Sequence, residues 1–242
     1  MIMITIIGTG HIFRIAEPVS FIIKNSWPEA VLVELDERRY VALTSSGSEK
    51  GDIPKNVPKI YRESARYQDR MSEENGVRTG SELLAAINSG TMIGAQIVCI
   101  DKDAEQVMRE VEEEMSFMER RRYSFSSISD NLFGRKKVED TQKDFSLNEQ
   151  QYIENMRKRY PTLVRKLIDE RNEYMAEKIR SESEKYNNMV VVVGDAHVEG
   201  MCGLLDGLEI RKIRLAELMD RESMDKIRLQ IWNNEWKGRN EN

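Results

Sequence analysis

The only two histidines of this 242-residue sequence, His11 and His197, end two similar motifs. The first motif is GTGH at 8–11 and the second is GDAH at 194–197, so each histidine lies three residues after a glycine. An imidazole can coordinate a metal, act as a base or form a structural hydrogen bond. Because no histidine occurs elsewhere, the matching contexts favour a shared functional site over two separate structural roles. A glycine at each position would let the chain turn off its strand and leave room for a ligand.

Two carboxylates are candidates to complete a metal site with these histidines. Glu34 lies near the end of the apolar run AVLVEL, and Asp195 lies inside the second motif. Two histidines and one carboxylate form a facial triad that leaves positions for water and substrate. With zinc, such a set is typical of hydrolytic sites, in which the metal lowers the pKa of bound water to about 7. The alternatives are a surface or capping role for Glu34 and a turn role for Asp195.

The tripeptide Glu170-Arg171-Asn172 is the third group that can do chemistry. An arginine can clamp a carboxylate or polarise a carbonyl group. Charged residues on a helix more often form solvent-exposed ion pairs, and the sequence alone favours that interpretation here.

The elements that must position these residues are apolar, β-branched runs. Such runs precede both histidine motifs, at 2–7 and 189–193, and are typical of buried parallel strands. Further strands are expected at 30–35, 95–100 and around 208–215. Ligands of open α/β sheets bind beyond the carboxyl ends of the strands. We therefore expect both histidines to reach the same edge of one sheet.

Helical patterns fill most of the sequence between these strands. Helices are expected at 12–26, at 82–89, from about 104 along the stripe Val107, Val111 and Met115, from a capping box at 146–149 to about 160, from 161 to about 186, and at 217–237. Loops are expected at 44–58 and 124–148. The predicted fold is α/β, with a mixed sheet from two βαβ-like halves and a long helical insertion in the middle. We expect a single domain over 1–242, mainly helical from about 104 to 186.

Composition excludes several classes of function. The net charge of −5 argues against a nucleic-acid partner, and no apolar stretch has the length of a membrane span. No P-loop and no Gly-x-Ser-x-Gly motif occur. Two cysteines without metal-ligand spacing indicate reduced thiols, and the N-terminus lacks the features of a signal peptide, so a cytoplasmic protein is expected. The methionines at 108, 115 and 118 form a core stripe or a subunit contact; core is favoured, and a homodimer stays open.

Several stretches, in this order, resemble the TraB family, which includes bacterial pheromone-shutdown proteins and the Tiki metalloproteases. They are GTGH at 8–11, VELDERR at 33–39, GSELLAAI at 80–87, IDKDAEQVMRE at 100–110, IDERNEYMA at 168–176 and VVGDAHVEG at 192–200. The resemblance implies metal-dependent peptidase chemistry in an α/β fold with two βαβ-like halves around one site. The family motifs fall on His11, Glu34, Arg38, Glu82, Glu170, Arg171, Asn172 and His197.

This sequence departs from the family in two respects. Many relatives have Gly-x-Gly-His at the second motif, whereas this chain has Asp195 and Ala196 between glycine and histidine. Relatives in the pheromone branch carry membrane spans of a kind that this sequence does not show, so an envelope-bound role is not expected.

The sequence and the resemblance together predict a metal-dependent hydrolase that cleaves peptides. His11, His197, Glu34 and Asp195 are the expected ligands of a divalent cation, manganese, cobalt or zinc. The expected catalytic residues are Glu82 or Glu170 as general base, Arg171 with Asn172 for the developing oxyanion, and Arg38. The alternative is a non-catalytic regulatory protein that binds and sequesters a small peptide or ligand in the same cleft.

Overall fold

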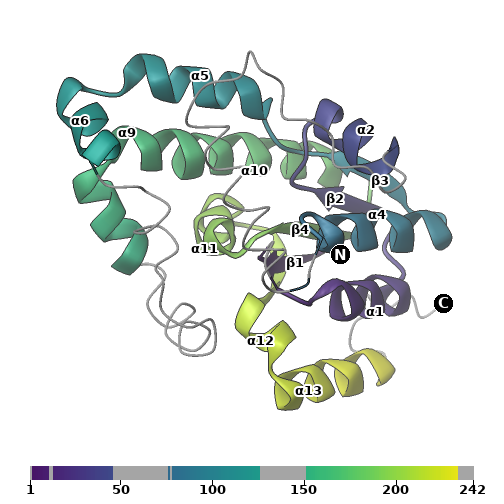
Figure 1. Ribbon diagram of the computed structural model, residues 1–242. Helices are drawn as coiled ribbons and strands as arrows, with labels where there is room; N and C mark the ends of the chain where they lie inside the picture. The colour runs from purple at the N-terminus through teal and green to yellow at the C-terminus, as the bar shows by residue number, and fades with distance from the viewer. Residues whose placement is uncertain (1, 11–12, 46–75, 77, 126–150, 234–242) are drawn as a thin grey trace.

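The structure, a computed structural model, describes residues 2–10, 13–45, 76, 78–125 and 151–233 (Figure 1). The strands are β1 (Met3–Thr9), β2 (Ala30–Val33), β3 (Gln96–Cys99), β4 (Asn188–Gly194) and β5 (Glu209–Ile213). They form a five-stranded sheet in the order β3-β2-β4-β1-β5, and every pair is parallel. The α/β class is confirmed, and the described sheet is purely parallel. The apolar runs of the sequence form its three central strands because helices cover both faces.

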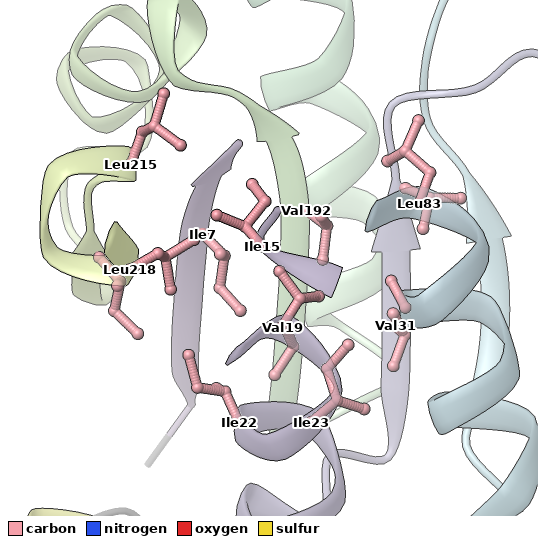
Figure 2. Close-up of a cluster of buried hydrophobic side chains, with 14 of the residues drawn as sticks. Ile7, Ile15, Val19, Ile22, Ile23, Val31, Leu83, Val192, Leu215 and Leu218 are labelled. Carbon is pink, nitrogen blue, oxygen red and sulfur yellow. The ribbon is translucent and has the colours of Figure 1, made fainter. Parts of the chain in front are cut away.

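One face of the sheet is covered by four helices. They are α1 (Ala16–Ser26), α4 (Ser81–Met92), α12 (Leu215–Met219) and α13 (Arg221–Trp232). Figure 2 shows Ile7, Val31 and Val192 of the three central strands pointing into this layer. Their side chains are fully buried against α1, α4 and α12.

The opposite face is covered by α10 (Glu170–Ser183) and α11 (Asp195–Leu204). The alternate strand residues, among them Ile6 and Val191, pack there against Met175 and Met201. Helix α11 starts directly after β4 and was not expected from the sequence. Its apolar residues Val198, Met201 and Leu205 are buried and follow helical spacing, which is the signal that would have predicted it.

The order in which the chain adds strands to the sheet reverses at its centre, between β1 and β4. From β1 the chain passes through α1 to β2 and through α4 to β3, always toward one edge. From β4 it passes through α11 to β5, toward the other edge and across the opposite face. Adjacent strands whose connections run in opposite directions leave a crevice at their carboxyl ends, where ligands of such folds bind.

A helical arm connects β3 to β4. It comprises α5 (Ala104–Glu114), α6 (Phe117–Phe125), helical residues 151–159, α9 (Pro161–Val164) and the π-helix η1 (Arg165–Asp169), which leads into α10 (Figure 1). The arm has its own small core, in which Met115 and Tyr160 are buried, while Met118 is exposed. Most of the expected loops at 124–148 and 44–58 lies outside the described residues, and their described ends, 124–125 and 44–45, are helical. No helix in the described part of the chain has both the length and the apolar character to cross a bilayer.

Candidate active site

Five side chains meet at the carboxyl edge of the sheet, and we call them the edge cluster. Glu34 follows β2, Asp101 follows β3, Arg171 and Asn172 lie in the first turn of α10, and His197 lies in the first turn of α11. All five are largely buried, although the cluster contains four ionisable groups. Buried charges persist in proteins only when they are paired and hydrogen-bonded, so the contacts among these residues define the site.

Arg171 is the centre of the edge cluster. Its Nε donates to Asp101 Oδ1 at 2.9 Å, and its Nη2 donates to Asp101 Oδ2 at 2.7 Å and to Glu34 Oε1. Its Nη1 donates to the carbonyl oxygen of Leu167 at 3.1 Å and lies 3.2 Å from His197 Nε2. A guanidinium has five N–H groups, and all five are used here. Arg171 therefore joins β2, β3, α10 and α11 and has no donor left over in this arrangement.

The imidazole of His197 is oriented by Asn172. Its Nδ1 lies 2.7 Å from Asn172 Oδ1, and since an amide oxygen only accepts, Nδ1 carries the proton. Nε2 is then an acceptor for Arg171, and it lies 3.4 Å from Glu34 Oε1. Gly200 makes this contact sterically feasible, because a Cβ there would lie 2.3 Å from Asn172 Nδ2.

Glu34 is held as a carboxylate. Its Oε2 accepts the backbone N–H of Gly194 at 2.5 Å, at the positive end of the α11 dipole. Burial raises the pKa of Glu34, but the neighbouring His197 ring, the Arg171 guanidinium and the hydrogen bonds to the carboxylate outweigh it, so the pKa lies well below its usual value. Burial likewise lowers the pKa of Arg171, but Glu34 and Asp101 more than compensate and raise it.

Two residues next to the edge cluster were not expected from the sequence. Arg39 Nη1 donates to Asp101 Oδ2 at 3.2 Å, and Asp36 accepts the backbone N–H of Arg39 at 2.9 Å. Asp101 itself was also missed, although it ends a predicted strand at the same edge as Glu34. The neighbouring Arg38, which the family motif selects, is exposed and faces Asp103 and Glu105 instead.

The other predicted site residues lie on different elements of the structure. Asp195 accepts from Arg214 and from the backbone of Leu215. Glu82 is fully buried in the first turn of α4. Glu170 faces the helical arm, where it pairs with Arg165 and with Lys166. His11 lies outside the described residues.

The described residues do not, as placed, fit a divalent cation. His197 Nε2 and Glu34 Oε1 come together, but the guanidinium of Arg171 contacts both atoms and supplies the positive charge. Both oxygens of Asp195 are engaged by Arg214. Within the described ranges, no three acidic, histidine or cysteine side chains are arranged to hold a metal. The predicted metal site therefore depends on His11 and on a shift of Arg171, and it stays a prediction.

Comparison with known proteins gives the chain a family. The model of the TraB/PrgY/gumN family matches residues 2–216. An uncharacterized protein of Methanocaldococcus jannaschii, MJ1365, is 30% identical over 214 residues, which cover 85% of this chain and 54% of that protein. The chain thus spans about half the length of this curated relative. The match extends from β1 into α12 and includes every residue of the edge cluster, and on this evidence the chain belongs to the TraB/PrgY/gumN family.

Proposed function

We propose that the protein is a hydrolase that cleaves peptide substrates at the carboxyl edge of its sheet. The observation that carries the proposal is the pairing of His197 with Asn172 next to the Glu34 carboxylate. A histidine whose Nδ1 proton is fixed by an amide oxygen presents Nε2 as a base, as in other histidine-dependent hydrolases. Proton transfer by a positioned side chain, most often a histidine, is the usual form of general acid–base catalysis.

In the proposed reaction, His197 transfers the proton and Glu34 stabilises the charged imidazole. Water gives a proton to Nε2 of His197 while its oxygen bonds to the carbonyl carbon of the substrate. The carbon–nitrogen bond then breaks, and the imidazolium returns the proton to the leaving amine. Glu34 stabilises the imidazolium, since its carboxylate is ionised and 3.4 Å away. For the first step, water replaces Arg171 as the partner of Nε2.

Two features that were expected from the sequence, an oxyanion role for Arg171 and a metal ion, are not part of this proton transfer. The oxyanion role of Arg171 requires an N–H that is released from its present contacts. The predicted manganese, cobalt or zinc ion would polarise water or substrate if His11 completes its site. Both stay predictions. A cation bound at Nε2 would occupy the lone pair that takes the proton, so the cation and the base role of His197 are alternatives.

A second candidate function is binding without turnover. It is favoured by the hydrogen bonds of Arg171, which use all of its N–H groups. A cluster whose donors are all paired can hold a binding site rigid without taking part in a reaction. The occupant would be a small peptide or ligand that the protein sequesters.

A mixed peptide library distinguishes these functions. The full chain is incubated with the library alone, with manganese, cobalt or zinc, and with a chelator, and products are identified by mass spectrometry. We expect cleavage that falls by roughly a hundredfold or more in His197→Gln, because a general base contributes that much. Lys226→Ala, an exposed change on α13, is the control and should cleave like the wild type.

The outcomes separate three conclusions. Cleavage that disappears in chelator supports the predicted cation in place of His197 as a free base, and cleavage that persists assigns the reaction to the protein's own side chains. Binding of peptides without any product would replace the hydrolase with the sequestering function. Equal cleavage by His197→Gln and wild type would overturn the proposal.

A further inference from the structure

We propose that Asp195 is a positioning residue for His197, and that Gly8 of the first motif provides the space its carboxylate needs. The inference deepens the proposed function and rests on it to the extent that His197 is the base. It gives Asp195 a role through Arg214 that differs from the metal-ligand role expected from the sequence.

The carboxylate of Asp195 is buried and fully hydrogen-bonded. Oδ1 accepts from Arg214 Nε at 2.9 Å and from the backbone N–H of Leu215 at 2.8 Å, and Oδ2 accepts from Arg214 Nη2 at 2.8 Å. The side chain of Asp195 is 2% exposed. A bidentate arginine–carboxylate pair of this kind fixes both distance and orientation. Asp195 thus fastens the start of α11 to the end of β5 and the start of α12.

Gly8 explains how this carboxylate reaches its place. Gly8 lies in β1 opposite Val193 of β4. A Cβ on Gly8 would lie 2.0 Å from Asp195 Oδ1 and 3.0 Å from Val198 Cγ2. No residue with a side chain fits there while Asp195 holds Arg214. Gly8 of the first motif therefore leaves the space that the Asp195 carboxylate of the second motif occupies.

Two attachments then fix the first turn of α11 from opposite sides. On the β2 side, Glu34 accepts the N–H of Gly194 at 2.5 Å. On the β1 and β5 side, Asp195 holds Arg214. His197 lies two residues after Asp195, and its Nδ1 must stay 2.7 Å from Asn172 Oδ1 on a different helix. If the Asp195 attachment is lost, this first turn can rotate and the His197–Asn172 bond lengthens.

The first test is Asp195→Asn, which keeps the shape but removes the charge. Nitrogen-15 spectra of the imidazoles report the tautomer, and His197→Gln assigns the signals because the chain has only two histidines. We expect the Nδ1-protonated tautomer of His197 in the wild type and a mixture of tautomers in the variant. Peptide cleavage should lose roughly ten- to a hundredfold in kcat with little change in KM, as a misplaced base does.

Glu199→Gln is the matched control. Glu199 lies on the same helix and pairs with the same arginine, through Arg214 Nη1 at 3.0 Å, but it is more exposed. It should leave the His197 signals and kcat unchanged. The proposal is overturned if Asp195→Asn keeps the wild-type spectrum and kcat, or if Glu199→Gln has the same effect. If the wild type cleaves nothing, the proposed function fails, while the spectra still decide the positioning role.

A double-mutant cycle tests the close packing of Gly8 against Asp195 without any assay of activity. Gly8→Ala alone should be strongly destabilising because its methyl group meets the Asp195 carboxylate. Adding Asp195→Ala removes that carboxylate, so the double variant should unfold at a higher urea concentration than Gly8→Ala does. Recovery should be partial, since the contact with Val198 remains. A double variant that folds no better than Gly8→Ala would show that the space at Gly8 does not serve Asp195.

Discussion

Two networks of charged side chains use neighbouring residues of η1 and α10, and most of their members differ in exposure to water. The edge cluster surrounds Arg171, whose side chain is 14% exposed and whose partner Asp101 is 1% exposed. The second, which we call the arm network, joins Arg165, Lys166 and Glu170 to Glu110 and Glu114 of α5. Its pair between Arg165 and Glu114 is 45% and 43% exposed, and Lys166, at 8%, is the one member of the arm network as buried as the edge cluster.

The difference in burial gives the same residue types different roles. Exposed ion pairs contribute little, because water and salt screen them. Buried pairs are costly to assemble, and they become strongly destabilising when one member is removed, since the other charge is left without compensation. The π-helix Arg165–Asp169 carries Arg165 and Lys166 of the arm network and leads into α10, which carries Arg171, and such distortions of helices recur at functional sites. We therefore expect substitutions in the edge cluster to disturb the geometry of the candidate site, and substitutions in the arm network to affect mainly the surface of the protein.

The largest expected effect is that of Arg171→Ala. This change leaves the buried Glu34 without its cation and leaves Asp101 with Arg39 alone. Removal of one partner from a buried pair costs about 3–5 kcal/mol. Urea unfolding followed by circular dichroism measures the loss. Arg165→Ala in the arm network is the matched control and should unfold at nearly the wild-type urea concentration. Equal losses in the two variants would contradict the comparison.

A smaller effect is expected for Gly200→Ala on α11. Its methyl group would overlap Asn172 Nδ2, and overpacking of this kind costs about 1–3 kcal/mol. Gly203→Ala on the same helix meets no atom within 4 Å and should stabilise by about 0.5–1 kcal/mol through helix propensity. Thermal unfolding of both variants gives the sign of each effect. A stabilising Gly200→Ala would mean that α10 and α11 do not approach so closely at His197.

The decline of stability in acid tests the state of Glu34 in the edge cluster. The pKa of Glu34 is lower in the folded protein than its ordinary value, so its contribution is complete above the ordinary value. That contribution is lost as the pH falls toward the folded pKa. Glu34→Gln should therefore flatten the decline of unfolding free energy in acid, measured by urea titrations at a series of pH values. An unchanged decline would show that Glu34 is not held as a carboxylate.

The strands and their shared edge could be predicted from the sequence because their signal is local. Uniform apolar runs mark β1, β2 and β4, and the residues that follow parallel strands must share an edge. This placed Glu34 and His197 together. Helix α11 was missed even though Val198 and Met201 have helical spacing, because the short motif before it was interpreted as a turn.

The partners of the charged residues could not be predicted, since they depend on tertiary contacts. Asp195 is paired with Arg214, which lies 19 residues further along and only approaches it through β5. Arg38 and Arg39 are adjacent in the sequence, yet only Arg39 contacts Asp101. The type of a residue indicates the chemistry it can do, but the choice between a buried and an exposed role is made by packing.

The smallest expected effect comes from Glu114→Gln, and it should depend on salt. Hydrogen bonds from Lys166 and Arg165 lower the pKa of Glu114, but the carboxylate is exposed to solvent. At low ionic strength the variant should unfold at a slightly lower urea concentration than the wild type, and at about 1 M salt the two should coincide, because the Debye length is then about 3 Å. Glu34→Gln should keep its difference from the wild type in the same salt, since buried pairs are screened much less. A loss in Glu114→Gln that persisted at high salt would mean that the arm network, too, is shielded from solvent, and burial would no longer distinguish the two networks.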